Sequence, residues 1–235
     1  MALHIEDRPS DSPHIARVWR SHSSGVDRMT SVATSHWELV VWTHRGATHA
    51  AVRGPETAAS TAEVPDDSES FGVSFAHGVS MPHLPVPLLV DRQLDSPHVG
   101  GGAFVLRGER WPLPTFDDAE EFVARLVREG VLACDPLVAE ALDGGTPPTS
   151  RRTLQRRVAA ATGLTPSAIR QIERARQAAL LLGEGAAPLD VVHRLGYYDQ
   201  PHLSRSLRRF IGRTATQLRR ADPAQPLSLL YKTRT

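Results

Sequence analysis

Cysteine is nearly absent from the sequence, which has Cys134 alone among its 235 residues. A single thiol excludes an internal disulfide and any zinc site built on several thiolates. Long apolar runs are also missing. No segment reaches the roughly 18 consecutive apolar residues of a membrane-spanning helix, and the polar first residues lack the apolar stretch of a signal peptide. We therefore expect a protein of the reducing cytoplasm, without a membrane partner.

Motifs for catalysis and metal binding are missing as well. The sequence has no Gly-x-Ser-x-Gly nucleophile motif and no His-x-His pair followed by a glutamate. Eight of the eleven histidines lie between His14 and His98, but their spacing is too irregular to define a metal site. The sequence therefore predicts no catalytic residue, no metal and no cofactor.

Lysine is absent from residues 1–143, which carry 11 arginines against 21 acidic residues and a net charge of −10. Residues 144–235 have the opposite balance, with 16 basic residues, 5 acidic residues and a net charge of +11. This asymmetry indicates an acidic module joined to a module that binds a polyanion.

The acidic half of the chain contains short apolar segments separated by turn signals. Several short strands without intervening helices favour an antiparallel sandwich or barrel over a parallel sheet. The candidate strands are 37–42, 48–53 and 71–75, and the turn signals are Gly54-Pro55, 65–67 and the proline-rich stretch 82–87.

The pattern becomes helical from Thr115 onward. An acidic stretch at 117–121 marks the first turn of a connecting helix within 116–134. We expect a second short helix over 135–142 and a stiff turn at 144–149.

A helical unit occurs twice in the basic half of the chain, at a separation of 49 residues. Both the apolar positions and an arginine position recur, so two copies of one structural unit are implied. The matching pairs are Leu154 and Leu203, Arg156 and Arg205, Val158 and Leu207, Gly163 and Gly212, and Thr165 and Thr214.

The first copy predicts a helix from an N-cap at Ser150 to about Thr162. An apolar stripe of Leu154, Val158 and Ala161 faces inward. The opposite face suits the major groove of DNA, because the planar fork of arginine matches guanine and glutamine can pair with adenine. The side chains on that face are Arg151, Arg152, Gln155 and Arg156.

The second copy predicts a helix after an N-cap at Asp199. A short helix over 189–195 precedes it and ends at Gly196, so helix, glycine turn and basic helix follow one another in helix-turn-helix order. Residues 168–182 predict one long helix that connects the two units. The expected buried stripe is Leu203, Leu207 and Phe210, and the outward side chains are Gln200, Ser204, Arg205, Arg208 and Arg209.

At these residues the chain resembles the AraC/XylS family of bacterial transcription regulators. The resemblance covers about residues 135–220, and its most specific part is 195–214. It implies two helix-turn-helix units joined by a linker helix, with a sensor or dimerisation domain upstream that is often a cupin-like barrel. It also implies that bases are contacted by Arg152, Gln155 and Arg156 in the first unit and by Gln200, Ser204 and Arg205 in the second.

Three positions depart from the family pattern. Ala215 stands where proline is usual, Val192 stands where a small alanine is common, and the turn at 144–149 differs from the usual one. Because valine is bulkier than alanine, we expect Val192 to widen the angle between the helices of the second unit and to make binding by that unit less specific.

The predicted fold class is α+β, with a mostly β, cupin-like small barrel or sandwich domain followed by an all-α domain. The expected parts are a sensor or dimerisation domain at 1–115, a connecting helix at 116–134, a double helix-turn-helix domain at 135–220 and a tail at 221–235.

The predicted function is a regulator that binds double-stranded promoter DNA in successive major grooves, modulated by an unknown small-molecule effector or partner at the N-terminal domain. A homodimer and, for an activator, RNA polymerase are further expected partners. Two alternatives stay open: a cupin-like metal enzyme whose basic tail tethers it to nucleic acid, and a nonspecific architectural DNA binder. The residues predicted to contact DNA are Arg151, Arg152, Gln155, Arg156, Gln200, His202, Ser204, Arg205, Arg208 and Arg209.

Overall fold

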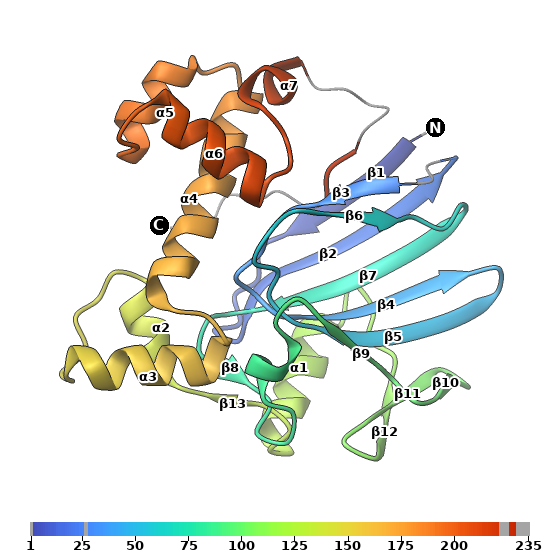
Figure 1. Cartoon of the computed structure of the whole chain (residues 1–235). Coiled ribbons are helices and arrows are strands. Elements are labelled where there is room, and N and C mark those ends of the chain that lie inside the picture. Colours follow the sequence, from blue (N-terminus) through green and yellow to red (C-terminus); the bar gives the residue numbers. More distant parts are fainter. Residues whose placement is uncertain (1, 26–27, 221–225, 229–235) are drawn as a thin grey trace.

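The protein has a β domain followed by a helical domain, as the computed structural model in Figure 1 shows for residues 2–25, 28–220 and 226–228. The largest element is a six-stranded antiparallel sheet, called the main sheet below. In spatial order its strands are β1 (Ala2–Arg8), β2 (Ile15–Ser24), β7 (Ser68–Phe75), β4 (Glu38–His44), β5 (Ala47–Arg53) and β9 (Gln93–Asp95).

Smaller strand groups surround the main sheet. The pair β3 (Arg28–Ser31) and β6 (Ser60–Glu63) lies over one face of it (Figure 1). Residues 226–228 extend this pair, because Leu227 forms a parallel bridge with Thr30. The rest of the predicted tail at 221–235 lies outside the described residues. The remaining elements are β8 (Val79–Ser80), which pairs with β13 (Ala133–Cys134), the antiparallel group of β10 (Val99–Gly100), β11 (Ala103–Leu106) and β12 (Glu109–Pro112), and the short 3-10 helix η1 (Val86–Leu89).

The two faces of the main sheet have different surroundings, because successive side chains of a strand point to opposite sides. One face carries the core of the β domain, where Val18 and Val73 are fully buried. Helix α1 (Ala119–Arg128) contributes its apolar side to the same core. The other face carries Trp19 and Trp42 and lines a cavity under the β3–β6 pair.

The prediction of a mostly β N-terminal region is confirmed, and its candidate strands 48–53 and 71–75 fall within β5 and β7, while 37–42 begins one residue before β4. The longest strand, β2, is not predicted, because Ser21 and Ser23 point to the cavity and interrupt the apolar pattern. β1 and β9 form the two edges of the main sheet, so the described strands make an open sheet. A cupin-like barrel stays a prediction.

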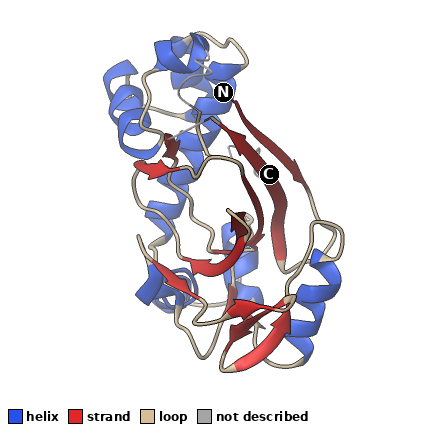
Figure 2. Cartoon of the chain, turned by 90° about the vertical axis from the view of Figure 1, so that its right-hand side faces the viewer, coloured by secondary structure: helices blue, strands red, loops and turns tan. Residues whose placement is uncertain are grey.

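The helical domain is arranged around one long central helix, α4 (Figure 1). The predicted helices are all present, with small shifts at their ends. Figure 2 shows this domain beside the curved main sheet. The helices are α2 (Pro136–Leu142), α3 (Arg151–Thr162), α4 (Pro166–Gly183), α5 (Pro188–Leu195), α6 (Gln200–Phe210) and α7 (Ala215–Arg220).

The two domains share packing across their boundary. Val32 and Ala33, next to β3, are buried within the core of the helical domain. The N–H of Ala33 donates to the carbonyl oxygen of Phe210 at 2.8 Å, and the N–H of Ala59 donates to the carbonyl oxygen of Arg209 at 2.8 Å. The C-terminal end of α6 is therefore held by backbone donors of the β domain.

The helix expected at 116–134 belongs to the β domain rather than to a free connection. The guanidinium of Arg8 on β1 forms two hydrogen bonds, at 2.6 and 2.8 Å, to the carboxylate of Glu120 on α1. It also donates to the carbonyl oxygen of Phe116 at 2.6 Å. The hydrogen bonds from Arg8 lower the pKa of Glu120 from 4.5 to about 2. This pair joins the first strand of the β domain to helix α1.

We expect Glu120→Gln to lower the free energy of unfolding by about 1 kcal/mol or less at neutral pH, because the ion pair is partly exposed. The pKa of Glu120 is lower in the folded protein than in the unfolded chain, so its contribution is present above pH 4.5 and is lost as the pH falls toward 2. Urea unfolding of the two proteins across this range tests the prediction. A stability difference that does not shrink on acidification would contradict it.

Candidate nucleic-acid interface

The first basic helix, α3, has well-defined ends. The hydroxyl of Ser150 accepts a hydrogen bond from the N–H of Thr153 at 3.1 Å, which is the N-cap that the sequence predicts. At the other end Gly163 has a φ of 73° and lies against η1, where a Cβ would approach Val90 to 2.4 Å. Glycine is required there by both conformation and space. The orientation of α3 on the β domain is therefore fixed at its C-terminal end.

The two faces of α3 separate as expected. Val158 and Ala161 are buried, and Leu154 is partly buried against the same core. The side chains on the opposite face are exposed: Arg151, Arg152, Gln155 and Arg156.

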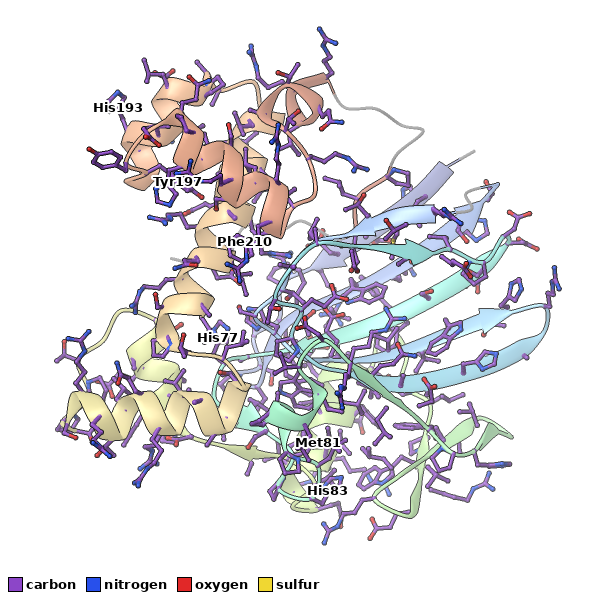
Figure 3. The ribbon with its side chains drawn as sticks, in the orientation of Figure 1. His77, Met81, His83, His193, Tyr197 and Phe210 are labelled. Atoms are coloured by element: carbon purple, nitrogen blue, oxygen red, sulfur yellow. The ribbon has the colours of Figure 1, made fainter. Side chains whose placement is uncertain are left out.

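The second basic helix, α6, follows a four-residue turn. The turn begins at Gly196, which ends α5 with a φ of 66°. Asp199 caps α6, because its carboxylate accepts a hydrogen bond from the N–H of His202 at 2.7 Å. Tyr197 anchors the turn to α4, since its ring lies 4.4 Å from the guanidinium carbon of Arg174 (Figure 3). Helix, glycine turn and basic helix are thus present in the predicted order.

The exposed face of α6 carries most of the predicted residues, and one of them is turned away. Gln200, Arg205, Arg208 and Arg209 are exposed, and Ser204 is half-buried. The ring of His202 stands edge-on to Tyr197 at 5.2 Å between centroids, and its Nδ1 accepts from the N–H of Tyr198 at 3.4 Å. The structure therefore places His202 against the turn.

The helix α4 joins the two units. It contacts α3 near one end and α5, α6 and α7 along the rest of its length. Its buried side chains include Ile169, Ile172 and Leu182, which pack in the single core of the helical domain. An 18-residue helix is about 27 Å long, so α4 acts as a rigid spacer between the two units.

Arginines of the β domain and arginines of the basic helices differ in their partners. In the β domain, Arg8, Arg17 and Arg20 form ion pairs with Glu120, Asp7 and Glu6. On α3, Arg157 pairs with Asp135, the N-cap of α2, at 2.7 Å. In the part of the chain that the structure describes, no acidic residue pairs with the other exposed arginines of these helices, which are Arg151, Arg152, Arg156, Arg205, Arg208 and Arg209.

Two exposed features of this surface were missed by the sequence analysis. α7 carries the exposed Arg219 and Arg220, and a capping box that the sequence contains could have predicted it. In that box Thr214 and Gln217 each accept a hydrogen bond from the other's backbone N–H, at 3.2 and 2.8 Å. Tyr198 is 91% exposed in the turn before α6. The presence of an aromatic residue in such a turn is the sequence signal that could have predicted this feature.

Two of the departures from the family pattern are accommodated locally. Val192 is buried in the core of the helical domain and α5 ends normally at Gly196. Ala215 begins α7 without proline, because the Thr214 cap supplies the start of the helix.

No three histidine, cysteine, aspartate or glutamate side chains come together in a metal-binding arrangement among residues 2–25, 28–220 and 226–228. No helix in those residues is long and apolar enough to cross a membrane. The Cys134 thiol is exposed, and both desolvation and the nearby Asp135 raise its pKa. It therefore has no feature of an activated nucleophile.

A comparison with protein families matches residues 148–221 to a family described as a helix-turn-helix domain. These residues therefore contain a helix-turn-helix domain. The match includes α3, α4, α5, α6 and α7, and thus both basic helices and the helix that joins them. No curated protein and no solved structure matches the chain.

We expect Asp199→Ala to lower the free energy of unfolding by about 1 kcal/mol, because the first turn of α6 loses its cap. Asp199→Asn should retain most of this stability, since asparagine also caps helices. Urea unfolding followed by circular dichroism measures the change. The control is Asp143→Ala, which removes an exposed carboxylate at the end of α2 and should cost less than about 0.5 kcal/mol. Equal losses in the alanine variants would argue against the cap.

Proposed function

We propose that the protein is a sequence-specific DNA-binding transcription regulator whose helices α3 and α6 enter successive major grooves. The observation that carries this proposal is the pair of exposed arginine-rich faces without acidic partners, one on each unit of the helix-turn-helix domain. Unpaired arginines can bind phosphates and guanine edges without first breaking an ion pair within the protein.

The spacing of the two units supports contact with successive grooves. One turn of DNA is about 34 Å long, and α4 is a rigid helix of about 27 Å with one unit near each end. Both units can therefore lie along one side of a duplex, with the β domain on the other side of α4 (Figure 1).

The side chains divide into two proposed roles. Residues in the N-terminal part of each helix contact base edges, whereas Arg151 at the first position of α3 and the arginines farther along α6 contact phosphates and fix the register. His202 acts on the turn of the second unit rather than on a base. The proposed base contacts are Arg152, Gln155, Arg156, Gln200, Ser204 and Arg205, and the proposed backbone contacts are Arg151, Arg208 and Arg209.

The β domain is the proposed sensor or dimerisation domain. Its packing on α4 and on the end of α6 gives it a direct mechanical route to the recognition helices. A small-molecule effector at this domain, a homodimer on paired sites and, for an activator, a contact with RNA polymerase complete the proposal.

Footprinting of the purified protein on fragmented genomic DNA, with excess random competitor at physiological salt, tests the proposal. Discrete sites near promoters, each with two half-motifs about one helical turn apart, are the expected result. Uniform coverage with a steep salt dependence would instead identify a nonspecific architectural binder.

We expect Arg205→Ala to weaken binding to a specific site by about 1–3 kcal/mol and to relax the preference at one base position. Fluorescence anisotropy with specific and random duplexes measures both effects. Arg128→Ala serves as the control, because it removes an exposed arginine from α1, outside the helix-turn-helix domain. An equal loss on specific and random DNA would reassign Arg205 to a phosphate contact.

A further inference from the structure

The β domain contains a cavity of about 280 Å³. Its floor is the face of the main sheet opposite the core, and β3 and β6 cover it. The wall is completed by Arg176 of α4 and by Ser228 of the segment that extends β3. The cavity therefore lies where the β domain, the helical domain and residues 226–228 meet.

Two tryptophans give the floor of the cavity an aromatic surface. Trp19 on β2 lies beside Gly72 of β7, and a Cβ at Gly72 would lie 2.3 Å from the indole. The absence of a side chain at Gly72 thus allows the indole to lie over the strand. Trp42 on β4 is the second aromatic residue, with Val40 as its apolar neighbour on the same face.

Two carboxylates in the cavity have unused hydrogen-bonding capacity. Glu38 accepts a hydrogen bond from the hydroxyl of Ser74 through Oε1, and Glu56 accepts from the hydroxyl of Ser31 through Oε2 at 2.6 Å. Within the described residues, the other oxygen of each carboxylate has no hydrogen-bond or ion-pair partner. Burial raises the pKa of Glu56, and the nearby Glu38 adds to this effect, while the hydrogen bond from Ser31 and the charge of Arg53 oppose it.

The arginines of the cavity are directed to other groups. Arg176 is 2% exposed and donates to the carbonyl oxygen of Ala33 at 2.8 Å. Arg53 donates to Gln93 at 3.2 Å and its guanidinium carbon lies 5.8 Å from the centre of the Trp42 ring. Neither arginine forms an ion pair with Glu38 or Glu56, so the carboxylates can accept donors from a ligand.

We propose that this cavity binds a small organic cation with an aromatic or apolar body. Its N–H groups donate to Glu38 and Glu56, and its body packs against Trp19 and Trp42. Charge-assisted hydrogen bonds are stronger than neutral ones, and a cation is also attracted to the face of an indole ring. The net charge of −10 on residues 1–143 favours the approach of a cation further.

Binding of the cation in this cavity also affects the helical domain. This coupling to the helical domain rests on the proposed DNA-binding function. Arg176 forms part of the cavity wall and belongs to α4. The residue Ala33 links Arg176 to α6, because its carbonyl oxygen accepts from Arg176 and its N–H donates to the carbonyl oxygen of Phe210. A ligand that shifts Arg176 therefore also biases the position of α6. The factor by which the ligand changes the affinity for DNA equals the factor by which DNA changes the affinity for the ligand.

The test uses three probes of nearly equal shape and different charge: benzamidine, which is a cation at neutral pH, neutral benzamide and anionic benzoate. Titration of the full-length protein without DNA is followed by tryptophan fluorescence and calorimetry. We expect saturable binding of benzamidine and no binding of benzoate. Benzamidine should bind at least about tenfold more tightly than benzamide, since one charge-assisted contact contributes about 1.5–3 kcal/mol. Equal binding of benzoate, or no saturable binding of benzamidine, overturns the proposed site.

Variants locate the binding. Glu38→Gln and Glu56→Gln should each weaken benzamidine binding about tenfold or more, whereas Glu69→Gln should leave it unchanged. Glu69 is an exposed residue of β7 outside the cavity, so its substitution removes the same charge from the same sheet. Thermal unfolding shows whether the variants are folded. Equal affinity in the three folded variants overturns the assignment to Glu38 and Glu56.

The DNA measurement is separate from the binding measurement. Saturating benzamidine should change the affinity for a footprinted site, and Glu56→Gln should suppress the change. An unchanged DNA affinity while benzamidine is bound overturns the coupling through Arg176. Because benzamidine binding is measured without DNA, its failure leaves the DNA-binding proposal intact, and failure to bind DNA leaves the cavity proposal intact.

Discussion

The arrangement of the two domains depends on the buried guanidinium of Arg176. A buried cation is costly unless hydrogen bonds compensate it, and the carbonyl oxygen of Ala33 accepts one of them at 2.8 Å. The backbone N–H of the same residue donates to the last turn of α6. The residue Ala33 of the β domain thus contacts both the long helix α4 and the C-terminal end of α6.

This constraint explains how the β domain can influence the exposed faces of α3 and α6, which it does not cover. The recognition faces of α3 and α6 stay exposed, and the contacts between the domains involve the ends and the back of these helices. Gly163 at the end of α3 and Phe210 at the end of α6 are both points of contact. A change within the β domain would therefore alter the angle of the helices and leave their exposed side chains unchanged.

The helical domain was largely predictable from the sequence because its signals are local. The caps at Ser150 and Asp199, the glycine at Gly196 and the apolar stripes each lie within one or two turns of helix. The position of His202 was not predictable in the same way, because its contact with Tyr197 depends on how the turn folds back.

The fold class of the β domain was predictable from the sequence, but the pairing of its strands was not, because strand pairing joins segments that are distant in the sequence. β2 pairs with β7 across about fifty residues, and serines on their cavity face interrupt the apolar pattern. The cavity itself combines Trp19, Glu38 and Glu56 with Arg176 and Ser228. No spacing in the sequence brings these residues together, so only the folded chain identifies the candidate ligand site.

The short segment at 226–228 has a consequence for the mechanics of the whole chain. The N–H of Thr30 donates to the carbonyl oxygen of Pro226 at 3.0 Å, and the carbonyl oxygen of Thr30 accepts from the N–H of Ser228 at 2.8 Å. The hydroxyl of Ser228 also accepts from the N–H of Val32 at 2.9 Å. The chain thus leaves the β domain before α2 and returns to it after α7, so the helical domain is attached at two points. Together with the contacts at Gly163 and Phe210, these two attachments leave the helical domain little freedom to rotate as a separate body. A displacement at the cavity is therefore expected to reach the helical domain through several contacts at once.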